Sequence, residues 1–553
     1  MILRPFPLLL LLLAGFVSSC QPTTQRQPAD LLVYNATVYT VDSAFTQVEA
    51  FAVRDGKFVG VGTSAALREQ FAAAQEVDAK GQVVYPGFYD AHCHFYGYAM
   101  TLANADLVGA TSWPATVARL TAHRQAHPTA AWLAGRGWDQ NDWPGKRFPS
   151  KDTLDLLFPN TPVFLERVDG HAALVNQKAL DLAGITARTP ISGGVIGRDA
   201  QGRLTGLLVD NAVALVERKL PAPTPAEAET ALLQAQQNCV AVGLTSLADA
   251  GLGRTTIEQI AALQAQKKLK LRLYAMITPT KEDLEYYLRQ GPQFSDNLTV
   301  AAFKVYADGA LGSRGASLLR PYTDRPTETG FLLRTVADYR ALAKRLAASR
   351  FQMNTHAIGD SANRLMLDIY GEALRGQKDR RWRIEHAQVV TAADQPKFKQ
   401  FGVVPSVQPT HATSDMYWAG ERLGPERVKT AYAFEALRRQ YGQVALGTDF
   451  PVESINPFYT FHSAVARQDA KNFPTAGFQM ENAISREQAL RGMTTWAAHA
   501  GFEEKRKGQI KVGMLADFVV LGTDLLTAPN AQLRSANVQQ TWIGGKRVFS
   551  IKN

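Results

Sequence analysis

Eight short apolar stretches recur along the chain with helix-like stretches between them, and this alternation limits the possible fold more than any other feature. The first stretch ends at the pair His92 and His94. The other seven have the same strand-like composition and lie at 244–249, 271–277, 300–306, 351–356, 382–386, 403–408 and 444–449. Strands that alternate with helices favour a parallel sheet, and eight repeats predict an α/β fold of the (β/α)8 TIM-barrel type.

The segments outside these repeats predict two further units. Residues 96–223 break the alternation, so we expect an insertion after the first strand of a barrel that spans 87–500. Both ends of the chain, 31–86 and 501–553, consist of short strands broken by turns. An Asp-Gly pair at 55–56, between two alternating apolar stretches, is a strong hairpin signal. We therefore expect a small composite β-sandwich domain built from both termini.

The N-terminus has the pattern of an export signal. An apolar stretch of about ten residues, with a Leu-rich core from Leu8 to Leu13, is about half the length of a membrane-spanning helix. Residues 1–20 are therefore predicted to be a signal peptide. The segment ends in VSSC, which resembles the bacterial lipobox and makes Cys20 the expected lipidation site, followed by a tether at 21–30. The alternative is an ordinary secretory signal cleaved nearby. The lipobox predicts an exported lipoprotein of the periplasm or cell envelope, held to the membrane through its lipid anchor alone.

Composition and charge argue against a nucleic-acid partner. Apolar residues make up 46% of the 553 residues, which is typical of a chain that forms a core, and the net charge of +10 is spread without a block of Lys or Arg. We therefore expect no nucleic-acid partner. The remaining thiols, Cys93 and Cys239, do not make a disulfide framework, and Cys93 is expected to pack in the barrel wall. The oligomeric state stays open, and a homo-oligomer is compatible with the sequence.

Polar residues recur where the predicted strands end. His92 and His94 are spaced i, i+2, so their side chains project to the same face of a strand. Four later strands end in or near another ionisable residue: Lys304, His356, His386 and Asp449. Barrel enzymes gather such residues at the carboxyl ends of their strands. Imidazole and carboxylate groups together suit zinc or a similar divalent ion.

Seven motifs carry a resemblance to a known family. They are PGFYDAHCH at 86–94, GRGWDQNDW at 135–143, LERVDGHAALVN at 165–176, FKVYADGALGSRGA at 303–316, NTHAIGD at 354–360, RIEHAQ at 383–388 and ALGTDFPV at 445–452. Jointly they resemble the amidohydrolase superfamily of metal-dependent hydrolases. The resemblance is closer to its YtcJ-like branch, amidohydrolase family 3, which includes N-substituted formamide deformylases. With the terminal sheet segments it covers nearly the whole chain.

The resemblance implies a metal centre. Its expected ligands are His92, His94, His356, His386 and Asp449, with one or two divalent ions, most simply zinc. Lys304 matches a lysine that many relatives carboxylate to bridge two metals. An unmodified ammonium cannot bind a cation, so Lys304 is expected to be carboxylated, deprotonated or engaged in another role. Without carboxylation the site is expected to hold one metal.

The reaction that the resemblance implies is hydrolysis of an amide-type C–N bond in a small-molecule substrate, for example an N-formyl or N-acyl amine. A metal-activated hydroxide attacks the carbonyl, and Asp449 shuttles the proton to the leaving amine. Lys304 and His386 complete the expected catalytic set. Glu385, one residue before His386, is expected to face the other way and to be a structural pairing residue. The alternatives are a deaminase or a cyclic amidase of the same superfamily and, in another class, a non-catalytic ligand-binding lipoprotein.

Five further residues are candidates for substrate binding. In the insertion, Trp138 is expected to form an apolar wall, and His171 is expected to touch substrate, with a packing histidine as the alternative. Arg314 either orients substrate or ties down the barrel mouth. Gln408 and His411, in the loop after the seventh strand, are expected near the same mouth, and solvent exposure of His411 stays open as an alternative.

Overall fold

The computed structural model describes residues 1–2 and 26–551. Cys20 lies outside the described residues, as do most of the expected signal peptide at 1–20 and the first half of the expected tether at 21–30. Among the described residues, no helix combines the length and the apolar composition needed to cross a membrane.

Eight parallel strands form the predicted barrel sheet. In order of pairing they are β8 (Phe88–Cys93), β15 (Leu244–Leu252), β16 (Arg272–Ile277), β18 (Leu298–Tyr306), β19 (Gln352–Ala357), β20 (Arg383–His386), β21 (Val404–Val407) and β22 (Ala445–Leu446). The chain beyond β22 returns to β8: the backbone N–H of Asp449 donates to the carbonyl of His92 at 2.8 Å, and that of His94 donates to Phe450 at 2.8 Å. The barrel prediction is confirmed, and Cys93 is buried in its wall.

Helices follow the barrel strands, as the alternation predicted. The main ones are α7 (Pro225–Ala241), α8 (Arg254–Ala265), α9 (Lys281–Gln290), α10 (Val336–Ala347), α11 (Asp360–Leu374), α12 (Pro396–Phe401), α13 (Pro409–Asp415), α14 (Ala419–Arg427), α15 (Phe434–Tyr441), α16 (Pro457–Ala466), α17 (Arg486–Gly492) and α18 (Thr495–Ala500). Local sequence fixes where several of them begin. Thr224 and Thr335 each form a capping box with an acidic residue three positions later, which satisfies backbone N–H groups that a helix start leaves free.

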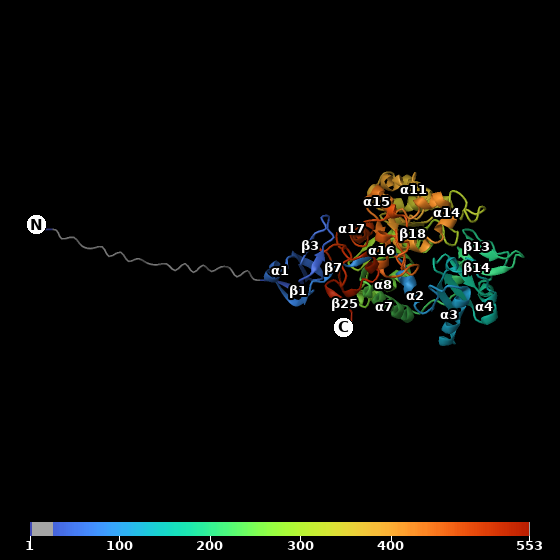
Figure 1. Ribbon diagram of the computed structural model, residues 1–553, viewed down its shortest axis with the longest axis horizontal. Coiled ribbons are helices and arrows are strands. Elements are labelled where there is room, and N and C mark those ends of the chain that lie inside the picture. Colours follow the sequence, from blue (N-terminus) through green and yellow to red (C-terminus); the bar gives the residue numbers. More distant parts are fainter. Residues whose placement is uncertain (3–25, 552–553) are drawn as a thin grey trace.

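The range expected for the insertion contains its own six-stranded sheet. The strands are β9 (Ala105–Asp106), β10 (Leu133–Trp138), β11 (Val163–Arg167), β12 (Ala172–Val175), β13 (Gly194–Arg198) and β14 (Leu204–Asp210). Its helices, with the short one after β8, are α2 (Phe95–Thr101), α3 (Trp113–Ala126), α4 (Asp152–Leu157), α5 (Gln177–Ala183) and α6 (Ala214–Glu217). In Figure 1 this sheet lies on one side of the barrel and the terminal sheets lie on the other.

The two termini build two packed sheets. One holds β1 (Gln27–Tyr34), β4 (Ala50–Arg54), β5 (Lys57–Gly62) and β6 (Phe71–Asp78), with α1 (Ser64–Gln70) between β5 and β6. The other joins both ends of the chain through β2 (Thr37–Tyr39), β3 (Gln47–Val48), β7 (Val83–Pro86), β23 (Phe518–Leu521), β24 (Val538–Ile543) and β25 (Lys546–Ser550). Phe51, Val84 and Phe518 share one core between the sheets, as expected for the composite sandwich.

One boundary at this end was wrong. Residues 27–30 were expected in the tether, but they belong to strand β1, which pairs in parallel with β6 from Gln27 onward. The polar, proline-containing sequence gave no strand signal there, because β6 supplies the pairing partner from 44 residues further along the chain. The hairpin predicted at Asp55-Gly56 is confirmed, since β4 and β5 pair antiparallel on either side of it.

Candidate metal centre at the barrel mouth

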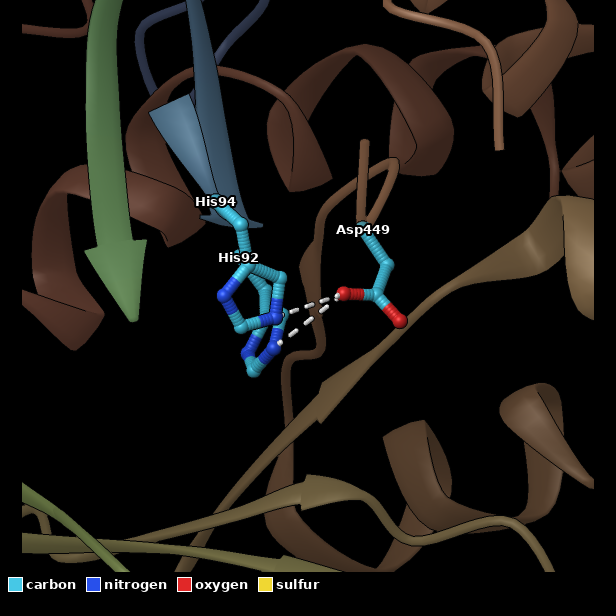
Figure 2. A group of neighbouring side chains, drawn as sticks. All are labelled: His92, His94 and Asp449. Carbon is cyan, nitrogen blue, oxygen red and sulfur yellow. Dashed lines mark ion pairs between the residues drawn. The ribbon is translucent and has the colours of Figure 1, made fainter. Parts of the chain in front are cut away.

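His92 and His94 leave the end of β8 toward one carboxylate. The Nε2 atoms of the two rings lie 3.5 and 3.3 Å from Oδ1 of Asp449 (Figure 2). The side chain of His92 is fully buried, whereas that of His94 is 28% exposed and can be reached from solvent. One ligand atom from each of the three residues lies within 4.8 Å of the others, which is the spacing of groups that share a metal ion. The i, i+2 spacing thus places both imidazoles beside the same carboxylate oxygen.

Asp449 is held in a tight turn just after β22. It has a positive φ of 63°, and Thr448 before it is fixed by Asp90 of β8, which accepts from the Thr448 hydroxyl at 2.7 Å and from its N–H at 3.0 Å. Burial raises the pKa of Asp449, but the neighbouring rings of His411 and His94 outweigh burial and hold this pKa well below its usual range. The group is therefore an anion, the form that can bind a cation or accept a proton.

His356 and His386 extend the cluster from the ends of β19 and β20. Their ring centres are 4.5 Å apart, and the ring of His386 is 5.0 Å from that of His92. Burial lowers the pKa of both rings well below the usual value, so both are neutral at neutral pH. Among the described residues, Nε2 of His356, Nδ1 of His386 and Oδ1 of Asp449 are buried without a hydrogen-bond partner. Buried lone pairs without partners are costly in a folded protein, and a bound cation satisfies them.

Lys304 points from β18 into the same cluster. Its buried Nζ lies 3.1 Å from Nε2 of His92 and 4.7 Å from the centre of the Tyr306 ring. Burial lowers the pKa of Lys304 to about 8, so a share of the side chain is neutral amine near neutral pH. The structure therefore brings Lys304 against an expected metal ligand.

Glu385 is a pairing residue, as the sequence predicted, but it does not face away from the cluster. Its Oε2 lies 2.6 Å from Nδ1 of His92, and its Oε1 lies 2.6 Å from Nε of Arg383. Strand alternation predicts that Glu385 and His386 face opposite ways, but His386 has a φ of 71°, so the alternation breaks at the strand end and both side chains reach His92. Burial raises the pKa of Glu385, but the attraction of Arg383 and His92 outweighs the effect of burial. The pKa of Glu385 is therefore far below its usual range. The Arg-x-Glu spacing, which puts 383 and 385 on one strand face, is the signal that could have shown this.

The donor set fits a divalent metal ion. A carboxylate on Nδ1 fixes the tautomer of His92 and leaves Nε2 as the coordinating atom, an arrangement typical of metal-binding histidines. Neutral imidazoles and an ionised carboxylate converge, and several of their buried atoms have no other partner among the described residues. The residues present can therefore hold a divalent ion, and the assignment of individual ligands stays a prediction.

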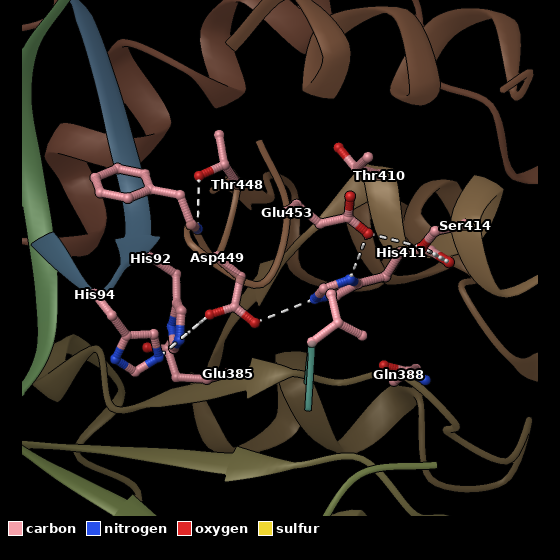
Figure 3. Close-up of polar contacts among 12 residues, drawn as sticks. His92, His94, Glu385, Gln388, Thr410, His411, Ser414, Thr448, Asp449 and Glu453 are labelled. Atoms are coloured by element: carbon pink, nitrogen blue, oxygen red, sulfur yellow. Dashed lines mark hydrogen bonds and ion pairs between the residues drawn. The ribbon is translucent and has the colours of Figure 1, made fainter. Parts of the chain in front are cut away.

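His411 lies beside Asp449 on the other side of its carboxylate. Its Nε2 is 3.2 Å from Oδ2 of Asp449, and its Nδ1 is 3.3 Å from Oε1 of Glu453, which also accepts from the Ser414 hydroxyl (Figure 3). Burial lowers the pKa of His411, but the two carboxylates outweigh burial and raise it well above the usual value. His411 lies near the strand ends as expected, but in helix α13 rather than in a loop. Its contact with Glu453 was not among the expectations.

Two other candidates also lie near the strand ends. Gln408 follows β21, and its side chain is buried. Among the described residues, neither the oxygen nor the nitrogen of its side-chain amide has a hydrogen-bond partner. His171, from the turn between β11 and β12, has its ring centre 4.9 Å from that of His356. The insertion therefore contributes directly to the mouth. Asp308, in the loop after β18, has a structural role, because it accepts hydrogen bonds from the backbone N–H groups of Ser317, Ile358 and Gly359.

Two candidates do not reach the cluster. The expectation for Trp138 was wrong: its side chain is fully buried in the core of the insertion, donates from Nε1 to the carbonyl of Leu165 at 2.8 Å and packs against Trp143. An apolar residue that ends a strand of an inserted sheet fills that sheet's own core before it can line a pocket. Arg314 donates to Asp324 at 2.7 Å, so its guanidinium ties down the loop after β18, the second of the two roles considered for it.

Known proteins resemble this chain over nearly its full length. It is 35% identical to the protein LONG AFTER FAR-RED 3 of Arabidopsis thaliana, covering 94% of this chain and 92% of that protein. Identity to YtcJ of Bacillus subtilis, which is named as an amidohydrolase, is 31% over 93% of this chain and 98% of that protein. Identity to the N-substituted formamide deformylase of Arthrobacter pascens is 28% over 94% and 98%.

Solved structures and family models agree with these relatives. A crystal structure of a metal-dependent hydrolase from Pyrococcus horikoshii superimposes with a TM-score of 0.74 at 27% identity, covering 90% of this chain and 99% of that one. The model of the amidohydrolase family matches residues 75–549. The chain therefore belongs to the amidohydrolase family and is a metal-dependent hydrolase that acts on carbon–nitrogen bonds.

Proposed function

We propose that this enzyme hydrolyses the amide bond of a small N-formyl or N-acyl amine with zinc at the barrel mouth. The observation that carries the proposal is the position of the Asp449 carboxylate. One oxygen faces His92 and His94, and the other faces His411. A single ionised group is thus placed to touch both a metal ion and a reacting water. The similarity to a deformylase along nearly the whole chain supports the same substrate class.

The ligands would come from six residues that the fold has already gathered: His92, His94, Lys304, His356, His386 and Asp449. When bound, a divalent ion lowers the pKa of water from about 15.7 toward about 7 and polarises a carbonyl oxygen. Zinc suits this set because it accepts imidazole and carboxylate ligands together.

Lys304 is proposed to be carboxylated. Its neutral amine adds to carbon dioxide and loses one proton, which gives a carbamate. The side chain, which cannot bind a cation as an ammonium, then offers an anionic oxygen ligand. Two observations support this: Nζ lies 3.1 Å from Nε2 of His92, and its pKa of about 8 leaves part of the amine unprotonated. With the modification the site would hold two ions, and without it one.

Asp449 is proposed to move the proton. As an anion it accepts a proton from the attacking water, and as an acid it then delivers that proton to the nitrogen of the leaving amine. General acid–base help of this kind contributes about 10²–10⁴-fold. His411 and Glu453 hold the carboxylate in place, because His411 bridges the two acids.

Metal content and turnover test the proposal together. The full chain, extracted in detergent, is analysed for zinc and assayed on N-benzylformamide, N-acetylbenzylamine, a cyclic imide and adenosine. We expect bound zinc and release of amine from the first two compounds. Ammonia release from adenosine would show a deaminase instead, and hydrolysis of the imide alone would show a cyclic amidase. Protein without metal and without turnover, even after refolding with zinc, would contradict the proposal.

We also propose that the enzyme is an exported lipoprotein anchored through Cys20. The support is the short apolar segment followed by VSSC at 17–20. In a bacterial host, mass spectrometry of the mature N-terminus should show a lipid-modified cysteine as its first residue. The variant Cys20→Ser should lose the lipid and leave the membrane fraction. An unmodified N-terminus elsewhere in the segment would favour the ordinary secretory signal.

A further inference from the structure

The insertion carries a histidine–carboxylate pair of its own. His171 lies in the turn between β11 and β12, and its Nδ1 is 2.6 Å from Oδ1 of Asp210. Asp210 ends β14 with a φ of 50°, and its backbone N–H donates to the carbonyl of His171 at 2.7 Å. The two residues, 39 positions apart in the sequence, are therefore held together by a backbone contact and a side-chain contact.

The barrel loop after β18 makes room for this carboxylate. A Cβ atom added at Gly309 would lie 2.4 Å from Oδ2 of Asp210, and one at Gly315 would lie 2.3 Å from the same oxygen. Real Cβ atoms essentially never approach that closely, so the GALGSRG segment needs glycine at both positions. The Asp210 side chain is fully buried, and its Oδ2 has no hydrogen-bond partner among the described residues. A buried carboxylate with one side-chain partner is a costly feature, which points to a role for that partner.

The partner, His171, stands beside the candidate metal ligands. Its ring centre is 4.9 Å from that of His356 and 6.4 Å from that of Tyr306. Its side chain is 16% exposed, so the mouth remains open to it. Because Asp210 accepts from Nδ1, the nitrogen left for other contacts is Nε2, and no hydrogen bond to Nε2 is formed within the described part of the chain.

Four imidazoles are neighbours in the order His171, His356, His386 and His411. Successive ring centres are 4.9, 4.5 and 6.1 Å apart. Asp449 contacts His411 at one end of this order, and Asp210 contacts His171 at the other. A substrate placed over the two middle rings would therefore meet Asp449 on one flank and His171 on the other.

We propose that His171 contacts the amide group of the substrate through Nε2, and that Asp210 is the positioning residue that fixes the ring of His171 for this contact. The substrate class rests on the proposed function. The carboxylate sets the Nδ1–H tautomer and the ring orientation, in the way that acidic groups orient catalytic and metal-binding histidines. The insertion thereby supplies a part of the active site that the barrel strands do not.

A double-mutant cycle separates this role from simple packing. Asp210→Asn keeps the size of the side chain between Gly309 and Gly315 but removes its charge. We expect kcat/KM on N-benzylformamide to fall by about 10–100-fold, while zinc content and Tm are retained. In the background of His171→Ala, the same change should have an effect below about twofold, because a positioning residue acts through its partner. Asp199→Asn, in the exposed hairpin between β13 and β14, is the matched control and should leave kcat/KM unchanged.

Equal losses from Asp210→Asn in both backgrounds would overturn the proposal, because they would show that Asp210 acts without His171. Full activity of His171→Ala would overturn it too. A readout independent of turnover uses protein labelled with ¹⁵N-histidine, in which the His171 signals are assigned from their absence in His171→Ala. We expect an Nδ1–H tautomer that changes in Asp210→Asn, and an Nε2 resonance that moves when N-benzylformamide or formate is added.

An Nε2–H tautomer, or a spectrum that neither compound alters, would overturn the inference even in an active enzyme. A shifted His171 signal in a protein that hydrolyses none of the amides would contradict the proposed function and leave this inference standing. The two failures are therefore distinguishable.

Discussion

The barrel and the insertion each place a histidine against a buried carboxylate at the same mouth, but they support these pairs differently. In the barrel, His92 contacts Glu385, whose charge is met by Arg383 on the same strand. In the insertion, His171 contacts Asp210, whose second oxygen faces the glycines of a barrel loop. The His92–Glu385 pair has all its partners within the barrel sheet. The His171–Asp210 pair lies in the insertion and depends on how the insertion packs against the barrel. We infer that the first is tied to metal binding and stability, and the second to catalysis.

A second contact links the two regions. Arg136 of β10 donates to the carbonyl of Pro451, two residues after Asp449, at 2.6 Å, and to that of Val168 at 2.8 Å. The same guanidinium thus touches the turn that carries Asp449 and the segment that leads to His171. Motion of the insertion would therefore be felt on both flanks of the site.

The largest effect is expected on the barrel side, at Asp449. Asp449→Asn removes the base without changing the size of the side chain, so kcat should fall by about 10²–10⁴-fold. Circular dichroism should show an intact fold. Retained activity would show that the proton is carried elsewhere, and His171 on the opposite flank would then be the first residue to test.

Glu385→Gln tests whether the barrel pair is a metal-binding and stability element. The change leaves Arg383 buried without its counter-charge, and breaking a buried ion pair in this way lowers the free energy of unfolding by about 3–5 kcal/mol. Because Glu385 also orients His92, metal binding should weaken by about 10–100-fold. Chemical denaturation and zinc titration measure the two effects. Glu372→Gln, which breaks an exposed pair with Arg340, is the control and should match wild type. Unchanged zinc affinity in Glu385→Gln would remove the distinction between the two pairs.

Gly309→Ala tests the dependence of the insertion pair on docking. The added methyl would collide with Asp210, and overpacking of this kind costs about 1–3 kcal/mol. We expect kcat/KM to fall with zinc content preserved, because the displaced residue positions His171 and binds no metal. Gly420→Ala, in α14 with no atom within 4 Å of its Cβ position, is the control. Loss of zinc in Gly309→Ala would mean that the insertion pair also supports the metal site.

The smallest effect is expected at Trp138, inside the insertion. Trp138→Phe loses the hydrogen bond to Leu165 and some packing volume, so stability should fall by about 1–3 kcal/mol. KM for N-benzylformamide should not change, because the side chain is fully buried away from the mouth. A selective rise in KM at unchanged Tm would restore Trp138 as a pocket residue.

Sequence patterns predicted the barrel side of this comparison well, for a geometric reason. Parallel strands in a closed sheet all end at one mouth, so a histidine at the end of β8 and an aspartate just after β22 become neighbours once the strands are counted. The insertion side followed no such rule. His171 could be named from its motif, but its partner Asp210 comes from another strand of an irregular sheet, and no spacing in the sequence links the two.

The sequence by itself determined the barrel, its number of strands, the composite terminal domain and the residues at the strand ends, because strand and helix periodicity are local properties. Only the tertiary structure decided which other side chains contact the residues at the strand ends. A positive φ at His386 lets both Glu385 and His386 reach His92. Glu453, after β22, reaches His411 in α13, and Trp138 packs in the core of the insertion rather than in a pocket. Each of these depends on a backbone angle or on packing between distant segments, which a pattern of residue types does not specify.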